Sequence, residues 1–186
     1  MQILDSLLFN PLTNTFAERA EKIWPLPPRA QSMISDFARG IAILAPFLIA
    51  LFVLDNYFPI SKLDFYAFWP LTVLVFFNKD IVSGRSIAKR KLGFAIVKNN
   101  SEEPATQFQC FIRNITSILW PLEALLAFGG AEQRIGDFIA GTKVIEQPPQ
   151  DNSSFTAELI NTKISLQLII ANALVIAAGI TAQILF

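Results

Sequence analysis

The sequence has no histidine and one cysteine, Cys110, among its 186 residues. These absences exclude an intrachain disulfide and argue against zinc sites, haem ligand pairs and histidine-based acid–base catalysis. No Ser/His/Asp set or paired acidic motif is visible, and residues 84–89 lack the second glycine and the Lys-Ser/Thr ending of a phosphate-binding loop. We therefore expect no catalytic residues, no cofactor, no metal and no enzyme activity.

Charged residues are also scarce, at 16% of the chain, whereas a soluble domain averages about a quarter. The sequence contains no basic stripe interleaved with aromatic residues, which disfavours nucleic-acid binding. Apolar residues make up 53% of the chain, the mean hydropathy is +0.46, and the 17 phenylalanines suit a lipid-exposed surface. The composition therefore indicates an integral membrane protein built as one unit.

Residues 1–28 do not have the pattern of a membrane span. Asp5 interrupts the early apolar run, and no cationic region precedes it, so we expect no cleaved signal peptide. This lead-in could form a short amphipathic helix on the membrane surface or an irregular segment.

Three segments are predicted to cross the membrane. Residues 37–58 would give roughly 30 Å of helix, enough for the hydrocarbon layer. Residues 65–77 are shorter and contain Pro70, but flanking lysines can extend them by snorkelling. Residues 164–186 carry no charge and form the clearest span, preceded by a predicted linker at 147–163.

The charges of the loops predict the orientation. Residues 79–91 contain five basic residues and Asp80, whereas residues 55–64 contain two aspartates and Lys62. The positive-inside rule therefore places the 79–91 loop and the N-terminus in the cytoplasm of a multi-pass protein of the cell's inner (plasma) membrane.

A further apolar segment, residues 108–128, is interrupted by Arg113, Pro121 and Glu123. It either spans the membrane or forms a re-entrant helical hairpin that turns near Pro121. Residues 94–98 and 142–146 have the composition of short strands that lack other partners, so we expect them to pair on one side of the membrane. This pairing favours the hairpin. The predicted fold is all-α with a small cytoplasmic β-pair.

Charged residues in or beside apolar segments are the candidate functional residues, because charge at membrane depth is costly unless it is paired or hydrated. The candidates for an ion or proton site are Asp36, Asp137 and Glu123, and their candidate charge partners are Arg29, Arg39 and Arg113. Asp36 could pair with Arg39 or Arg113, and Arg29 could pair with Asp137. Such pairs would either fix helix packing or form a cation or proton site. Glu123, beside Pro121, resembles carboxylates at broken transporter helices.

The order of these residues resembles the RDD family of small bacterial and archaeal membrane proteins, which is named for one arginine and two aspartates. Four motifs within residues 29–146 carry the resemblance: Arg29-x6-Asp36, the run Gly84-Arg-Ser-Ile-Ala-Lys89-Arg-Lys-Leu-Gly93-Phe-Ala-Ile-Val97, Arg113, and the run Gln133-Arg-Ile-Gly136-Asp137-Phe-Ile-Ala-Gly141-Thr142-Lys-Val144. The chain departs from the family at Ala88, where glycine is usual, and at Ile135-Gly136, where Leu-His is frequent.

Two functions follow from these observations. The resemblance implies a transport-related role, in which Asp36 and Asp137 would exchange a small cation for protons. The alternative is a non-catalytic structural or assembly subunit of a larger membrane complex. The small residues Ala173, Ala177 and Thr181 recur every four positions and would let another helix approach closely. We expect the bilayer, together with a second copy or another membrane subunit, as partners.

Overall fold

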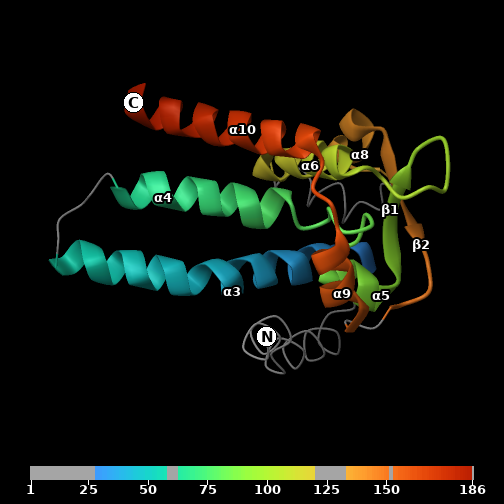
Figure 1. Ribbon diagram of the computed structural model, residues 1–186. Coiled ribbons are helices and arrows are strands. Elements are labelled where there is room, and N and C mark those ends of the chain that lie inside the picture. The colour runs from blue at the N-terminus through green and yellow to red at the C-terminus, as the bar shows by residue number, and fades with distance from the viewer. Residues whose placement is uncertain (1–27, 58–62, 120–132, 151–152, 186) are drawn as a thin grey trace.

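A computed structural model describes residues 28–57, 63–119, 133–150 and 153–185 of the chain. Three long helical rods lie side by side and point in the same direction from a compact head (Figure 1). The rods are α3 (Pro28–Tyr57), α4 (Leu63–Thr72) with its continuation η1 (Val73–Phe77), and α10 (Leu166–Leu185). The head contains α5 (Ile87–Leu92), β1 (Phe94–Lys98), α6 (Gln107–Ile115), η2 (Thr116–Leu119), α8 (Ile135–Ala140), β2 (Thr142–Glu146) and α9 (Ser153–Asn161). The predicted lead-in at residues 1–27 lies outside the described residues.

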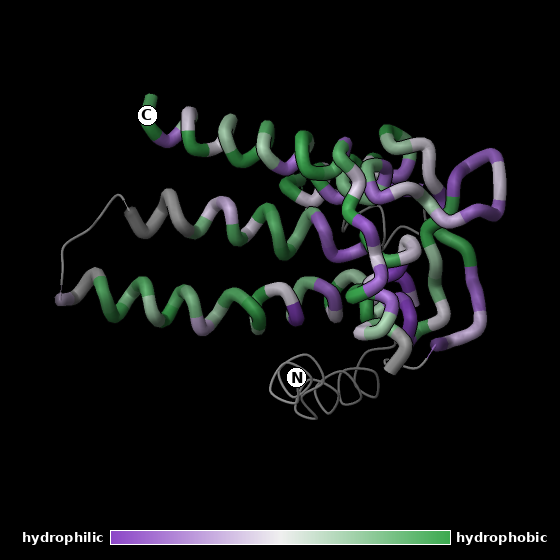
Figure 2. Tube along the Cα trace, viewed as in Figure 1, coloured by the Kyte–Doolittle hydropathy of each residue, from purple (hydrophilic) through white to green (hydrophobic). Residues whose placement is uncertain are grey.

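Two of the rods are long and apolar enough to cross a membrane: residues Pro28–Leu54 of α3 and the whole of α10. Few of their residues are buried within the protein, so they differ from the core helix of a soluble fold. Phe52 is 71% exposed and Leu174 65% exposed. Figure 2 shows apolar residues along the rods and polar residues concentrated in the head. The structure therefore has the mostly helical architecture that was predicted, and two of the three predicted spans lie in helices long enough to cross a membrane, whereas the predicted span at 65–77 lies in a shorter apolar helix.

The middle rod is shorter and is held between the other two by small residues. Its last five residues, Val73–Phe77, form a π-helix that follows Pro70, which has no N–H for a helical hydrogen bond. Gly40 of α3 leaves room for the ring of Phe76, and Gly179 of α10 leaves room for the indole of Trp69. The Trp69 indole N–H also donates to the Val175 carbonyl at 3.2 Å. These contacts join the rods along their length.

The two predicted strands form an antiparallel pair with the predicted bounds. Phe94 lies opposite Glu146, and Lys98 lies opposite Thr142. Each strand follows a six-residue helix that ends at a left-handed glycine, Gly93 (φ 73°) after α5 and Gly141 (φ 62°) after α8. The head therefore contains two copies of one unit, helix–glycine–strand, which meet through their strands.

The described segments on either side of residues 120–132 pack together in the head. α6 starts at a capping box formed by Thr106 and Gln109, and it continues as the 3₁₀ turn η2. The chain re-enters the described region at Gln133, and α8 then packs directly against α6. Gln109 Nε2 donates to the Ala140 carbonyl at 3.1 Å. Pro121 and Glu123 lie outside the described residues.

The segment predicted as a linker, 147–163, contains the helix α9. Gln147 and Gln150 tie the preceding chain to the head, because their N–H groups donate to the carbonyls of Gly93 and Arg90, both at 2.9 Å. The side chain of Gln107 in α6 then contacts the start of α10 through Lys163 and Ser165, at 3.0 and 2.9 Å. α10 is thus fixed to the head.

The apolar core lies where the rods meet the head. Val73 and Phe77 of the middle rod pack with Phe111 of α6 and with Leu168 and Ala171 of α10. A smaller cluster beneath the sheet contains Ile96, Ala105 and Cys110. Because Cys110 is fully buried and is the one thiol of the sequence, its reaction with a maleimide reports unfolding of the head.

Substituting Gly136 tests the contact between α6 and α8. A Cβ atom at this position would overlap the Arg113 carbonyl oxygen and the Thr116 hydroxyl. We expect Gly136→Ala to lower the free energy of unfolding by about 3 kcal/mol, measured by denaturant-dependent labelling of Cys110. Gly141→Ala is the control, because nothing lies within 4 Å of that position. It carries only the left-handed backbone cost of about 1 kcal/mol. Equal losses in the two variants would contradict the close packing of α8 on α6.

Candidate functional site

Five charged side chains from five segments form one buried chain of alternating charge at the junction of rods and head. We call this set the charge cluster. Its members, in spatial order, are Asp36, Lys89, Asp80, Arg113 and Asp137. Each is at most 7% exposed. Charges buried this deeply are tolerated only when opposite charges and hydrogen bonds replace the lost water.

Lys89 of α5 links the first two carboxylates. Its ammonium lies 2.9 Å from Asp36 Oδ2 and 2.8 Å from Asp80 Oδ1. The Ser86 hydroxyl also donates to Asp36 Oδ2 at 2.9 Å, and it accepts from the Lys89 backbone N–H at 3.2 Å as the N-cap of α5. The first turn of α5 is therefore fixed to α3 by a side chain that also caps it.

Asp80, which follows the middle rod, is the centre of the cluster and is fully buried. Its Oδ2 accepts from Asn114 Nδ2 at 3.0 Å and lies 3.6 Å from Arg113 Nη1. Burial alone would raise the pKa of the Asp80 carboxyl, but Lys89, Lys79 and Arg113 outweigh it and hold this pKa well below its usual range. Asp80 is therefore an anion at neutral pH.

Arg113 of α6 links Asp80 to Asp137 of α8. Its Nε donates to Asp137 Oδ1 in a close hydrogen bond, and the Thr142 hydroxyl donates to the same oxygen at 3.1 Å. The Arg134 N–H donates to Asp137 Oδ2 at 3.2 Å. Burial would raise the pKa of Asp137, whereas Arg113 and Arg134 lower it, and the net shift is downward. The aspartate is thus held ionised by groups from α6, α8 and β2.

The two helix–glycine–strand units contribute opposite charges from equivalent positions. Lys89 is the third residue of α5, and Asp137 is the third residue of α8. The small residues Ala88 and Gly136 precede them and are buried. The repeated unit therefore contributes a cation from α5 and an anion from α8, and Asp80 and Arg113 lie between them in the charge cluster.

The pairing partners differ from those predicted. Asp36 was expected to pair with Arg39 or Arg113, but its close partners are Lys89 and Ser86; Arg39 exerts only a longer-range attraction on it. Arg113 contacts Asp137 and Asp80, so its predicted pairing with Asp36 is wrong.

Two further candidates lie outside the charge cluster or outside the described residues. Arg29, which was expected near Asp137, donates from Nη2 to the Val144 carbonyl of β2 at 3.3 Å. Glu123 lies in the segment 120–132, which the structure does not describe. The cluster therefore contains two of the three predicted carboxylates.

Sequence reasoning missed Asp80 and Lys89. Both lie in the 79–91 loop, whose charged residues were used to predict the cytoplasmic side and not as candidate site residues. The Ser86 N-cap followed by a short helix and Gly93 marked an ordered segment, which was a signal that Lys89 had a fixed position.

The arrangement is suited to joining elements rather than to binding a metal ion. Every carboxylate of the charge cluster contacts a cationic side chain. Among the described ranges, no group of three or more His, Cys, Asp or Glu side chains has the geometry to hold a metal ion.

Removing the central charge should be costly. In Asp80→Asn, Lys89 and Arg113 lose the anion that they share, so we expect the free energy of unfolding to fall by about 3 kcal/mol or more in Cys110 labelling. The matched control is Glu103→Gln, which makes the same chemical change in the exposed Lys98–Glu103 pair. We expect the control to unfold like the wild type, and a loss in Asp80→Asn no larger than in Glu103→Gln would contradict the role of the cluster.

The lowered pKa values of Asp80 and Asp137 predict acid sensitivity. A carboxyl whose pKa is lower in the folded state stabilises the fold above its unfolded pKa of about 4, and this stabilisation is lost as the pH falls below that value. We expect the thermal midpoint of the wild type to fall steeply below about pH 4. Asp80→Asn should show a shallower fall over the same range. Equal slopes for the two proteins would show that Asp80 titrates normally.

No protein-family model, no curated protein and no solved structure matches this chain. The geometry of the described residues is therefore the basis for assigning a function.

Proposed function

We propose that this chain is a multi-pass membrane protein in which α3, the α4–η1 rod and α10 cross the bilayer and the head lies in the cytoplasm. The outward-facing apolar residues of α3 and α10 support this proposal, because such surfaces are costly in water. The basic residues of the 79–91 loop place the head on the cytoplasmic side. With three rods leaving one head, the chain end after α10 would lie on the opposite side.

The segment between α6 and α8 would then form a re-entrant hairpin. α6 and α8 pack against each other, and β1 and β2, which flank them in the sequence, pair in the head. A segment that crossed the bilayer once would separate these elements. Apolar side chains exposed nearby, Ile118 and Leu119 on η2 and Phe138 and Ile139 on α8, suit contact with the membrane.

The charge cluster supports membership of the RDD family. The four motifs that carry the resemblance are spread over more than a hundred residues, yet each contributes to one contact network. Asp36 of the first motif contacts Ser86 and Lys89 of the second, and Arg113, the third, contacts Asp137 of the fourth. This convergence is the observation on which the family proposal depends.

For this proposed membrane protein, we propose a non-catalytic structural or assembly role. A carboxylate that carries a small cation must exchange its partner for water or for the ion. In the charge cluster, Lys89 and Arg113 already contact the carboxylates and are themselves buried. The exposed ridge of Ala173, Ala177 and Thr181 on α10 offers a close-approach surface for a second copy or another membrane subunit.

Cation–proton exchange is the second candidate, and one observation favours it. Lys89 lies between two carboxylates, Asp36 and Asp80, at the junction of rods and head. A titratable amine in such a position can pass a proton if one of its partners is exposed to solvent during a conformational change. In this version Asp36 and Asp137 would be the acceptors.

Liposomes containing the purified chain distinguish the two roles. For an assembly subunit we expect sodium-driven proton flux no greater than in empty liposomes, together with a stable oligomer or a co-purifying membrane protein. Ala177→Leu should weaken that association, since its side chain fills the ridge. Ala178→Leu, an exposed position on an adjacent face of α10, is the matched control and should leave it unchanged.

Sodium-driven flux in the wild type that disappears in Asp36→Asn and Asp137→Asn would overturn the assembly role and establish exchange. Cys110 labelling of the same samples shows whether these variants are folded. Flux that survives in both folded variants would remove the carboxylate mechanism.

A further inference from the structure

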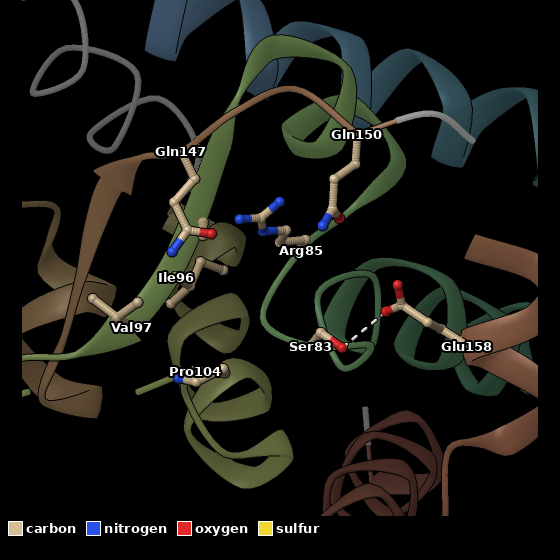
Figure 3. A pocket seen from close by; sticks show the side chains of 9 residues that line it. Ser83, Arg85, Ile96, Val97, Pro104, Gln147, Gln150 and Glu158 are labelled. Carbon is tan, nitrogen blue, oxygen red and sulfur yellow. Dashed lines mark hydrogen bonds between the residues drawn. The ribbon is translucent and has the colours of Figure 1, made fainter. Parts of the chain in front are cut away.

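A pocket in the head contains a buried arginine, Arg85, whose charge no described residue balances through an ion pair. The pocket, of about 260 Å³, is lined by residues of the 83–85 loop, β1, the chain after β2, and α9. Figure 3 shows the Arg85 guanidinium lying inside it, between Gln147 and Gln150, with Ser83 and Glu158 on another side. This pocket is separate from the charge cluster, whose members do not line it.

Arg85 is 6% exposed, and its Nη1 is buried without a hydrogen-bond partner in the described part of the chain. A buried guanidinium nitrogen without an acceptor is expensive, because the water it loses is not replaced. Burial and the nearby charge of Arg90 lower the pKa of Arg85, and the attraction of Glu158 does not offset them. Among the described residues, none gives the Arg85 Nη1 a negative acceptor in this pocket.

Glu158 does not supply that group because it is already engaged. Its two oxygens accept from Arg90 at 2.7 and 3.0 Å, and Oε2 also accepts from the Ser83 hydroxyl at 2.9 Å. Glu158 and Arg90 thus pair with each other, and no described carboxylate forms an ion pair with Arg85. The side chain of Gln150 accepts from Arg90 through Oε1 at 3.2 Å, so its amide nitrogen remains a donor, and Figure 3 shows it on the side of Arg85.

We propose that this pocket binds a phosphate-type oxyanion through Arg85, with the side-chain amide of Gln150 as a further donor. Donors from several directions suit the oxygens of a tetrahedral group better than a carboxylate, which one guanidinium can satisfy alone. The volume suits a phosphate or a small phosphoester. α9 ends at Asn161 and the proposed membrane helix α10 begins at Leu166, so the pocket lies near the membrane surface. The phosphate can therefore be free in solution or belong to a lipid headgroup.

The test uses the full-length protein in nanodiscs of phosphatidylcholine, with inorganic phosphate as the probe and chloride at matched ionic strength as reference. We expect millimolar phosphate to raise the thermal midpoint of the wild type, and acetate to have a much smaller effect. Arg85→Gln should bind phosphate about tenfold more weakly or worse. Without phosphate it should be at least as stable as the wild type, because the buried charge is gone. Lys143→Gln, which removes one positive charge from β2 outside the pocket, should respond like the wild type.

If Arg85→Gln does not fold, Gln150→Leu serves as the second variant and should weaken binding while the protein stays folded. Nanodiscs that contain phosphatidylglycerol identify the source of the phosphate. A shift there that requires Arg85 and is not competed by inorganic phosphate would assign the site to a lipid headgroup, and a shift with inorganic phosphate alone would assign it to a free ligand. No shift with either probe, an unchanged shift in Arg85→Gln, or an equal response to acetate would overturn the proposal.

Discussion

Lys89 occupies the position on which the rest of the structure depends. Its ammonium joins the Asp36 carboxylate of α3 to the Asp80 carboxylate at the end of the middle rod, and Arg113 continues the sequence to Asp137 of α8. Because water is excluded there, each charge needs its neighbours in a narrow range of positions. The geometry of these pairs therefore determines where the rods meet the head, with greater precision than apolar packing could impose.

The repeated helix–glycine–strand unit explains how so short a head forms this sequence of charges. Two strands of five residues are too small to be stable alone, but each is preceded by a helix whose third residue enters the charge cluster. Pairing of the strands brings both helices to the same junction. Both Ala88 and Gly136 are small and buried, and at Gly136 a Cβ atom would overlap the Arg113 carbonyl, so α8 packs directly against the backbone of α6.

The sequence predicted those features that depend on local pattern. The strands have the predicted bounds because apolar, β-branched runs begin at glycines that end the preceding helices, and the outer rods contain long apolar runs. The contact partners were not predictable in the same way. A lysine in a basic loop has the same composition whether it is solvated or buried, and only the tertiary arrangement places Lys89 beside two aspartates. The helix α9 was missed because two prolines and polar residues precede it, although Glu158 there holds Arg90.

The segment from Ser83 to Arg90 separates two kinds of charge in the same head. Ser86 and Lys89 face the charge cluster, where each anion contacts a cation. Arg85 faces the pocket, and no described residue accepts a hydrogen bond from its Nη1. Arg90 pairs with Glu158 at the edge of that pocket. The ion pairs of the charge cluster hold the fold together, and Arg85 takes no part in them. An oxyanion at Arg85 would act on the same short segment that holds Lys89 against Asp36 and Asp80. Occupancy of the pocket is therefore physically connected, through the chain from Arg85 to Lys89, to the contact that joins the head to the rods.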